Sequence, residues 1–187
     1  MPHLPSLGEE DYLEALFRRF PAGVGPLLAL HDRILRDSND LPVADRELIA
    51  AYVSGLNACD FCYGAHKTMA QAFGYEADFI ETLVKEGPEA AGVEARLAPL
   101  LAYVKQLTLA PSRVTESMAH AVLEAGWSEA ALYCAIQTTA LYNYMNRILD
   151  GAGIEPKPLF SDPDADALEA RREGTYEGWG RSAGLID

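Results

Sequence analysis

The spacing of apolar residues limits this chain to helices. Apolar side chains recur three and four positions apart along most of its length, alanine and leucine dominate, and alternating strand patterns are weak. This spacing places apolar side chains on one face of a helix, so the sequence predicts an all-α protein of about eight helices. The expected helices lie near Glu9–Phe20, Val24–Leu35, Pro42–Leu56, Cys59–Gly74, Glu76–Lys85, Val93–Thr108, Thr115–Glu124 and Ser128–Leu149.

Length and composition indicate one helical domain followed by a C-terminal arm. The chain has 187 residues and 49% of them are hydrophobic, which is enough for a substantial core. From residue 155 onward, prolines and a glycine-rich end replace the helical pattern. We therefore expect an all-helical domain over residues 1–154 and an arm over residues 155–187. The arm is expected to contain one short helix near Asp164–Arg172 and to pack on the domain or on a neighbouring subunit.

Charge and hydropathy exclude several classes of partner. The formal net charge is −13, so the phosphate backbone of a nucleic acid would be repelled, and no cluster of lysines and arginines suits an anionic membrane. No apolar run approaches the roughly 20 residues that span a bilayer. The polar, acidic N-terminus lacks the basic and apolar regions of a secretory signal. We expect a cytoplasmic protein that binds neither nucleic acid nor membrane.

The most specific local pattern is a pair of cysteines followed by a histidine. Cys59 and Cys62 lie three positions apart, His66 follows four positions later, and Glu47 precedes the first cysteine by twelve. Residues three and four apart share a helix face, so the two thiols and the imidazole are expected to point into one small volume. Glu47 can join them if its own helix packs alongside. Three cysteines are too few for a disulfide scaffold, so the close pair indicates redox or metal chemistry.

This arrangement suits thiol redox chemistry. A free thiol, with a pKa of about 8.5, is mostly protonated at neutral pH, and the thiolate is the nucleophile. The N-terminal end of a helix stabilises such an anion, and His66 lies one turn after Cys62, where it can take the thiol proton. Glu47 can orient that imidazole. A peroxide would convert one sulfur to a sulfenic acid, and the other sulfur would condense with it.

The full pattern Glu47-(11)-Cys59-(2)-Cys62-(3)-His66 resembles the active-site signature of the alkylhydroperoxidase D-like family, within the carboxymuconolactone decarboxylase superfamily. Flanking segments are similar to the family's lead-in helix and to its longer members, the peroxidase-related proteins. The resemblance covers roughly residues 15–155. The segments that share it are Asp45–Ala50, Ser54–Cys59, Ala125–Glu129 and Tyr142–Arg147.

The resemblance implies an all-helical fold that assembles as trimers or hexamers. It implies reduction of hydroperoxides through the cysteine pair, with an external thiol or dithiol, protein or small molecule, as reductant and with no bound cofactor or metal. Cys62 would meet the peroxide, Cys59 would resolve it, and His66 and Glu47 would form the proton relay. Helix physics alone favours the first cysteine of such a pair as the more acidic. We follow the family because His66 is one turn from Cys62.

One departure and several alternatives accompany this interpretation. Members of the family can carry a second histidine between the cysteines, whereas this chain has Phe61, which cannot move protons. Two thiols, an imidazole and a carboxylate can also bind Zn²⁺, and the pair can be buried and inert. The superfamily also contains lactone decarboxylases that do not depend on a cysteine pair. A further alternative is a non-catalytic, redox-responsive interaction protein whose disulfide changes its assembly.

Other polar residues receive structural interpretations. Cys134 has apolar neighbours and is expected to be a buried thiol, and His31 and His120 are expected to be surface or satisfied core histidines. Asp45 and Arg46 are expected to cap or solvate their helix. On the last long helix, an aromatic band is expected in the core, at a subunit interface or beside the thiols, and a polar group is expected to bond helix ends across a subunit contact. The band is Tyr133, Tyr142, Tyr144 and Met145, and the polar group is Asn143, Asn146 and Arg147. Alternatively, Arg147 can hold an anionic substrate.

Overall fold

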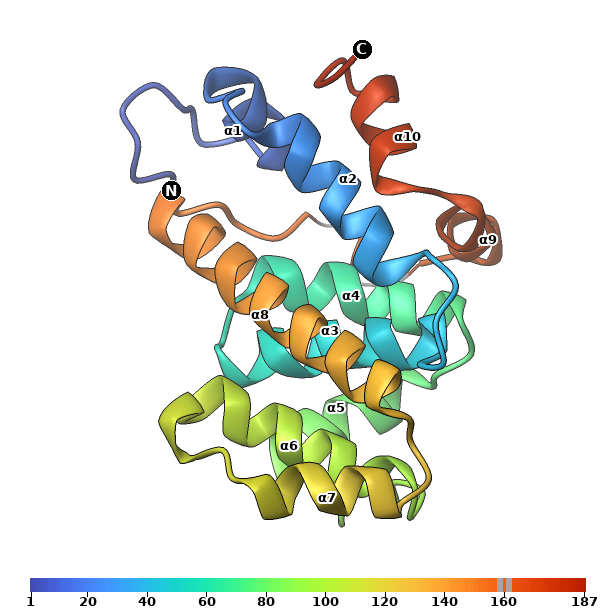
Figure 1. Ribbon diagram of the computed structural model, residues 1–187. Helices are drawn as coiled ribbons and strands as arrows, with labels where there is room; N and C mark the ends of the chain where they lie inside the picture. The colour runs from blue at the N-terminus through green and yellow to red at the C-terminus, as the bar shows by residue number, and fades with distance from the viewer. Residues whose placement is uncertain (158–159, 161–162) are drawn as a thin grey trace.

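The computed structural model describes residues 1–157, 160 and 163–187. Over these residues the protein is all-α, with ten α-helices, one short 3₁₀ helix and no strand, which confirms the predicted fold class (Figure 1). The α-helices are α1 (Leu13–Arg19), α2 (Val24–Leu35), α3 (Val43–Leu56), α4 (Asp60–Ala72), α5 (Ala77–Glu86), α6 (Leu97–Leu109), α7 (Glu116–Glu124), α8 (Glu129–Ala152), α9 (Ala165–Glu173) and α10 (Tyr176–Ser182); the 3₁₀ helix is Pro111–Arg113.

Helix α3 forms the centre of the core. Every residue from Arg46 to Ser54 is buried, so the helix is covered on all sides. It packs against α2, α4, α5, α6 and α8. Gly55 permits the approach of α5, because a Cβ at this position would lie 2.5 Å from Val84 Cγ1. Any polar side chain on the middle of α3 is therefore enclosed by protein, and Glu47 is one of them.

Helices α4 and α8 complete the frame around α3. The 24-residue α8 crosses α3 and α4 diagonally and runs from the end of the molecule formed by α6 and α7 toward the end formed by α1 and α2 (Figure 1). Its start is capped by Ser128, whose hydroxyl accepts from the Ala131 amide at 3.0 Å. Gly153, with φ of 69°, ends it in a left-handed cap. No helix among the described residues has the length and apolarity needed to cross a membrane.

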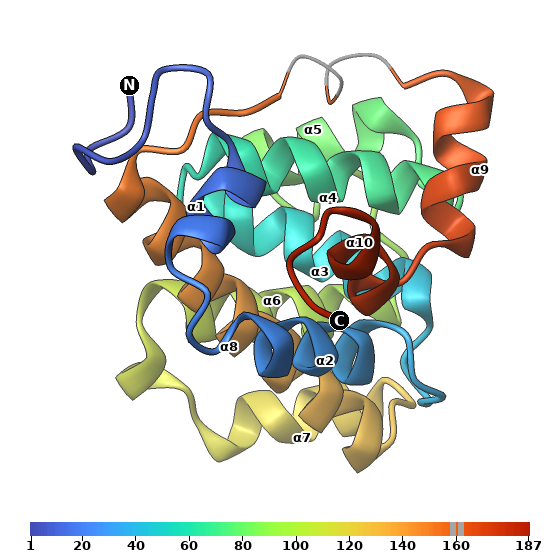
Figure 2. The same cartoon turned by 90° about the horizontal axis from the view of Figure 1, so that it is seen from above.

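The C-terminal residues fold back onto the same chain. Helix α9 packs on α4 and α10 packs on α2, so that α10 lies between α2, α4 and α9 when the molecule is seen from above (Figure 2). The sequence predicts α9 and misses α10. The carboxylate of Asp32, in α2, accepts from the amides of Tyr176 and Glu177 and caps α10 across a long sequence separation. Packing of this arm on a neighbouring subunit stays a prediction, and its residues 158–159 and 161–162 lie outside the described residues.

Candidate active site

A strained turn brings the two cysteines into place. Helix α3 ends at Leu56, and Ala58 adopts a left-handed conformation, with φ of 55°, before α4 begins. This conformation costs a residue other than glycine of order 1–2 kcal/mol, so surrounding contacts must hold the turn. Cys59 becomes the N-cap of α4 and Cys62 lies in its first turn. Both are buried and both are free thiols.

Asn146 of α8 fastens this turn to the rest of the domain. Its side chain donates to Ser54 Oγ at 3.0 Å and accepts from Asn57 Nδ2 at 2.8 Å. Its backbone carbonyl lies 4.0 Å from Cys59 Sγ. Asn143 accepts from the same Asn57 amide at 3.2 Å. We expected these asparagines to bond helix ends across a subunit contact, whereas the structure places their bonds within one chain, between α8 and the cysteine turn.

Glu47 is the fully buried acid of the site. Its Oε2 accepts a hydrogen bond from His66 Nδ1 at 2.6 Å, and its Oε1 accepts one from Arg36 Nη1 at 2.5 Å. Burial alone would raise the pKa of the Glu47 carboxyl, but the charges and hydrogen bonds of His66 and Arg36 outweigh burial and hold that pKa below its ordinary value. Two of the four residues that the sequence singled out, Glu47 and His66, are therefore in direct contact.

Arg36 is a member of the site that the sequence reasoning missed. It follows α2 directly and reaches Glu47 while its guanidinium lies over the rings of Phe73 and Tyr176, at 5.5 and 5.2 Å from their centroids. It also donates to the Leu35 carbonyl at 3.2 Å. Nothing in the local sequence marks Arg36, because all its partners except Leu35 come from distant parts of the chain.

The bond to Glu47 determines how the His66 ring presents its nitrogens. A carboxylate only accepts, so Nδ1 carries a hydrogen, and Nε2 is an acceptor whenever the ring is neutral. The ring packs edge-on against Tyr142, with centroids 4.3 Å apart. His66 follows Cys62 by one turn of α4 and lines the same cavity, but among the described residues no hydrogen bond joins the imidazole to the Cys62 thiol.

The two thiols differ in environment. Cys62 lines the cavity, whereas Cys59 lies behind it and has no exposed surface. The hydrogen bond with Cys62 and burial raise the pKa of the Cys59 thiol well above its ordinary value. The protonated form of Cys59 is therefore favoured, and Cys62 is the sulfur that lines the cavity. The catalytic roles that the family resemblance implies for the two sulfurs stay a prediction.

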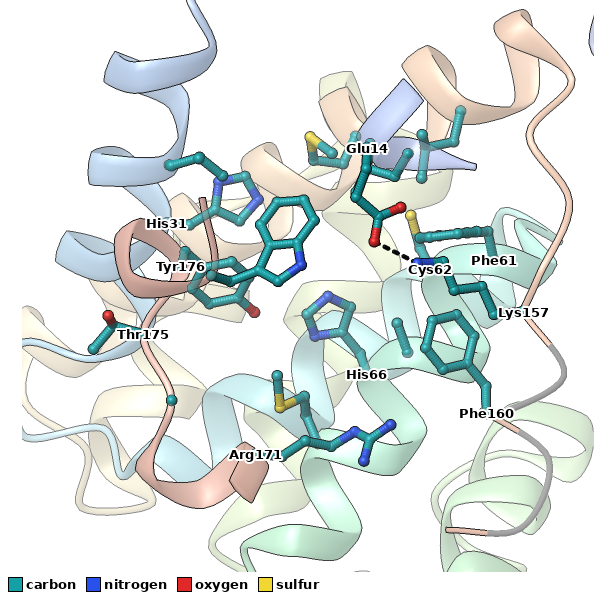
Figure 3. A pocket seen from close by; sticks show the side chains of 18 of the residues that line it. Glu14, His31, Phe61, Cys62, His66, Lys157, Phe160, Arg171, Thr175 and Tyr176 are labelled. Carbon is teal, nitrogen blue, oxygen red and sulfur yellow. Dashed lines mark hydrogen bonds and ion pairs between the residues drawn. The ribbon is translucent and has the colours of Figure 1, made fainter. Parts of the chain in front are cut away.

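The cavity in front of Cys62 has a volume of about 430 Å³, within the range of small-molecule sites. Figure 3 shows His66 between Cys62 on one side and His31 and Tyr176 on the other. At one edge Glu14 forms an ion pair with Lys157. The wall comes from α1, α2, α4, α8, α9 and α10 and is mainly apolar. Its apolar members include Leu13, Phe17, Phe61, Met69, Met145 and Trp179.

His31 is a second imidazole of this cavity, although we expected only a structural role for it. It is buried, and its Nδ1 lies 2.8 Å from the Leu27 carbonyl. Burial lowers the pKa of His31 from 6.5 to about 4, so the ring is neutral at physiological pH. The ring packs against Tyr176, with centroids 4.8 Å apart, and edge-on against Tyr142. The sequence could have indicated that His31 lines the cavity only through its position on the inner face of its helix.

Most of the other residues that the sequence singled out lie outside the cavity. Arg46 is buried and donates to the carbonyls of Leu41, Ile34 and Asp37, so it closes the end of α2 and does not cap or solvate its own helix, which corrects our expectation. Cys134 is buried, as predicted. Of the aromatic band, Tyr142 and Met145 line the cavity, whereas Tyr133 and Tyr144 are exposed. Over the described residues, no group of three or more His, Cys, Asp or Glu side chains is arranged to hold a metal ion.

Comparison with known families identifies the segment that carries the site. Residues 25–105 match the model of the carboxymuconolactone decarboxylase family. They include the four residues that the sequence singled out, together with Arg36 and His31. No curated protein matches the chain in sequence.

Solved structures share the fold. An uncharacterized peroxidase-related protein from Silicibacter sp. TM1040 superposes with a TM-score of 0.73 at 20% identity, over 79% of this chain and 77% of that one. An uncharacterized peroxidase-related protein from Ralstonia eutropha JMP134, described as an alkylhydroperoxidase AhpD core, gives 0.73 at 20% identity over 78% and 76%. ATU0492 from Agrobacterium tumefaciens, a putative antioxidant defence protein AhpD, gives 0.68 at 20% identity over 76% and 95%. The match of residues 25–105 to the carboxymuconolactone decarboxylase family confirms the predicted resemblance over that segment, and the solved structures confirm the fold.

Proposed function

We propose that this protein, whose residues 25–105 match the carboxymuconolactone decarboxylase family, is a thiol-dependent peroxidase that cycles between a dithiol and a Cys59–Cys62 disulfide. The observation that carries the proposal is the geometry of one helix turn. Cys62 and His66 face the same apolar cavity, and the buried Glu47 carboxylate bonds His66 at 2.6 Å. An ionised acid that orients an imidazole beside a nucleophile is the arrangement of a catalytic triad.

In the first step, His66 Nε2 takes the proton of the Cys62 thiol, and Glu47 stabilises the imidazolium that forms. The thiolate attacks the terminal oxygen of the hydroperoxide, so that a sulfur–oxygen bond forms and the oxygen–oxygen bond breaks. The electron pair leaves with the alkoxide, which takes the proton from His66. The products are an alcohol and Cys62 sulfenic acid, and the sulfur is oxidised while the peroxide is reduced.

In the second step, Cys59 resolves the sulfenic acid. The Cys59 sulfur attacks the Cys62 sulfur, the thiol proton leaves with the hydroxyl group as water, and a disulfide forms. The raised pKa of Cys59 keeps this thiol protonated until the sulfenic acid appears, which separates the two roles. An external thiol or dithiol then returns the pair to the reduced form. Assembly as a trimer or hexamer is part of the same proposal.

A hydroperoxide assay tests the proposal. The reduced protein, with a dithiol reductant, is expected to consume an organic hydroperoxide over many turnovers. Cys62→Ser is expected to abolish turnover, because it removes the sulfur that faces the cavity. Cys59→Ser is expected to stop after oxidation of Cys62. Cys134→Ser changes a buried cysteine outside the cavity and is the matched control. Equal rates in all three variants and the wild type would reject the proposal.

The family match favours a second candidate, a lactone decarboxylase. Glu47 and His66 can move a proton without help from either thiol, and the cavity is large enough for a small lactone. Decarboxylation of carboxymuconolactone by protein with alkylated cysteines would support this candidate. A reaction that needs both free thiols would support the peroxidase.

A further inference from the structure

His31 lines the cavity beside the thiol site, and the two steps above do not use it. It is 4% exposed and is held in place on three sides. Its Nδ1 meets the Leu27 carbonyl at 2.8 Å, and its ring packs against Tyr142 and Tyr176. These contacts give the imidazole a single orientation.

The Leu27 bond also determines the tautomer of His31. A carbonyl oxygen only accepts, so Nδ1 must carry the hydrogen. A neutral ring then has a lone pair on Nε2. No hydrogen bond joins this Nε2 to another of the residues that the structure describes, and His31 lines the cavity. The Nε2 lone pair is therefore available to the donor of a bound ligand.

We propose that His31 accepts, through Nε2, the hydrogen bond of the hydroperoxide's O–H group and holds the terminal oxygen in front of Cys62. This inference rests on the proposed function and adds a substrate-binding residue to it. In the proposed first step His66 takes the thiol proton and so loses its free acceptor, which leaves His31 as the imidazole of the mainly apolar wall that can accept from the hydroperoxide hydroxyl. The hydroxyl hydrogen stays on its oxygen during the reaction and becomes the hydrogen of Cys62 sulfenic acid, so His31 contacts the same O–H group before and after transfer.

The two imidazoles thereby have different roles. His66 has an ionised carboxylate at Nδ1, which favours the positively charged ring, and it moves the proton. His31 has a neutral carbonyl at Nδ1 and lies near His66 in an apolar wall, so it stays neutral and accepts. Phe61, which stands between the cysteines, offers no acceptor. An imidazole from α2 supplies one from the other side of the cavity.

Steady-state kinetics with cumene hydroperoxide test the role of His31. His31→Phe fills the space without an acceptor and is expected to raise KM about three- to tenfold with little change in kcat, as loss of one hydrogen bond to the substrate does. His31→Gln keeps an acceptor oxygen and is expected to restore most of the affinity. His120→Phe alters the exposed histidine of α7 and is the matched control. A KM in His31→Phe equal to that of the wild type, or equal losses in the Phe and Gln variants, would overturn the inference.

A binding measurement separates this inference from the proposed function. The alcohol product, 2-phenyl-2-propanol, presents the same kind of O–H group without reacting. Titration of the alcohol into the reduced, ¹⁵N-histidine-labelled protein is expected to shift the His31 Nε2 resonance toward that of a hydrogen-bonded nitrogen. The resonances of His120 are expected to stay unchanged. If the His31 Nε2 resonance shifts but the protein has no peroxidase activity, the acceptor role of His31 is retained and the proposed peroxidase function is rejected. If the alcohol saturates the protein with no change at His31 Nε2, the acceptor role is rejected.

Discussion

Replacement of His31 by glutamine is expected to make the fold less sensitive to mild acid. Burial lowers the pKa of His31 from 6.5 to about 4, so between these values the unfolded chain binds a proton that the folded chain does not. Stability therefore rises with pH in this window and is lost as the pH falls through it. Glutamine has no titratable group, so the variant lacks this contribution at every pH.

The size of the effect follows from the two pKa values. A difference of one pKa unit corresponds to about 1.4 kcal/mol, so full protonation of His31 would remove about 3 kcal/mol of folding free energy. Between about pH 7.5 and about pH 5.5, linkage predicts a loss of about 1 kcal/mol through this group. The lowered pKa of Glu47 also removes stability in acid, but at lower pH and equally in both proteins.

Urea denaturation at the two pH values measures the effect. The wild type is expected to lose about 1 kcal/mol more than His31→Gln over this window, whatever the variant does to stability at neutral pH. His120→Gln removes an exposed imidazole and should follow the wild type. If His31→Gln and the wild type lose equal free energy of unfolding, His31 is not the neutral, buried imidazole described above.

Three further substitutions test the contacts that hold the site in place, with the free energy of unfolding measured by urea denaturation. Glu47→Gln leaves the largely buried guanidinium of Arg36 without its counter-charge and is expected to cost about 3 kcal/mol; a loss below about 1 kcal/mol would contradict the ion pair. Ala58→Gly relieves the left-handed turn and is expected to stabilise the fold by about 0.5–1 kcal/mol, and a destabilised variant would show that the turn is unstrained. Gly55→Ala forces a Cβ against Val84 and is expected to cost about 2 kcal/mol of folding free energy. Gly151→Ala, which has open space around its Cβ, is the control and should stabilise the fold slightly. Equal effects of the two substitutions would refute the close approach of α3 and α5.

Local sequence patterns predicted those parts of the structure that local interactions determine. Apolar spacing gave the all-α class and the helices of the core, and the Cys-x-x-Cys-x-x-x-His spacing placed Cys62 and His66 together on α4. Contact between His66 and Glu47 followed from the family pattern, because the packing of α3 on α4 is not visible in either helix alone. Helix ends depend on local turns: the spacing predicts a first helix from near Glu9, whereas α1 begins at Leu13, after a turn in which Asp11 accepts from the Gly8 amide.

The features that the sequence did not predict depend on distant parts of the chain. Helix α10 has its own N-cap in Thr175, but its glycine-rich sequence is weak evidence for a helix, and Asp32 of α2 adds bonds to its first amides. Arg36 reaches Glu47 only because the end of α2 lies over α3 and α4. His31 becomes a cavity residue only once α10 brings Tyr176 against its ring. Each depends on tertiary packing, which residue spacing does not encode.

The most direct test is the mass of the cysteine-bearing peptide after one turnover. Reduced protein treated with one equivalent of cumene hydroperoxide, without reductant, is expected to lose two hydrogen atoms, with the loss mapped to a bond between Cys59 and Cys62 and with Cys134 unchanged. An unmodified thiol pair after the hydroperoxide has been consumed would contradict the account. So would oxygen added to Cys134 alone.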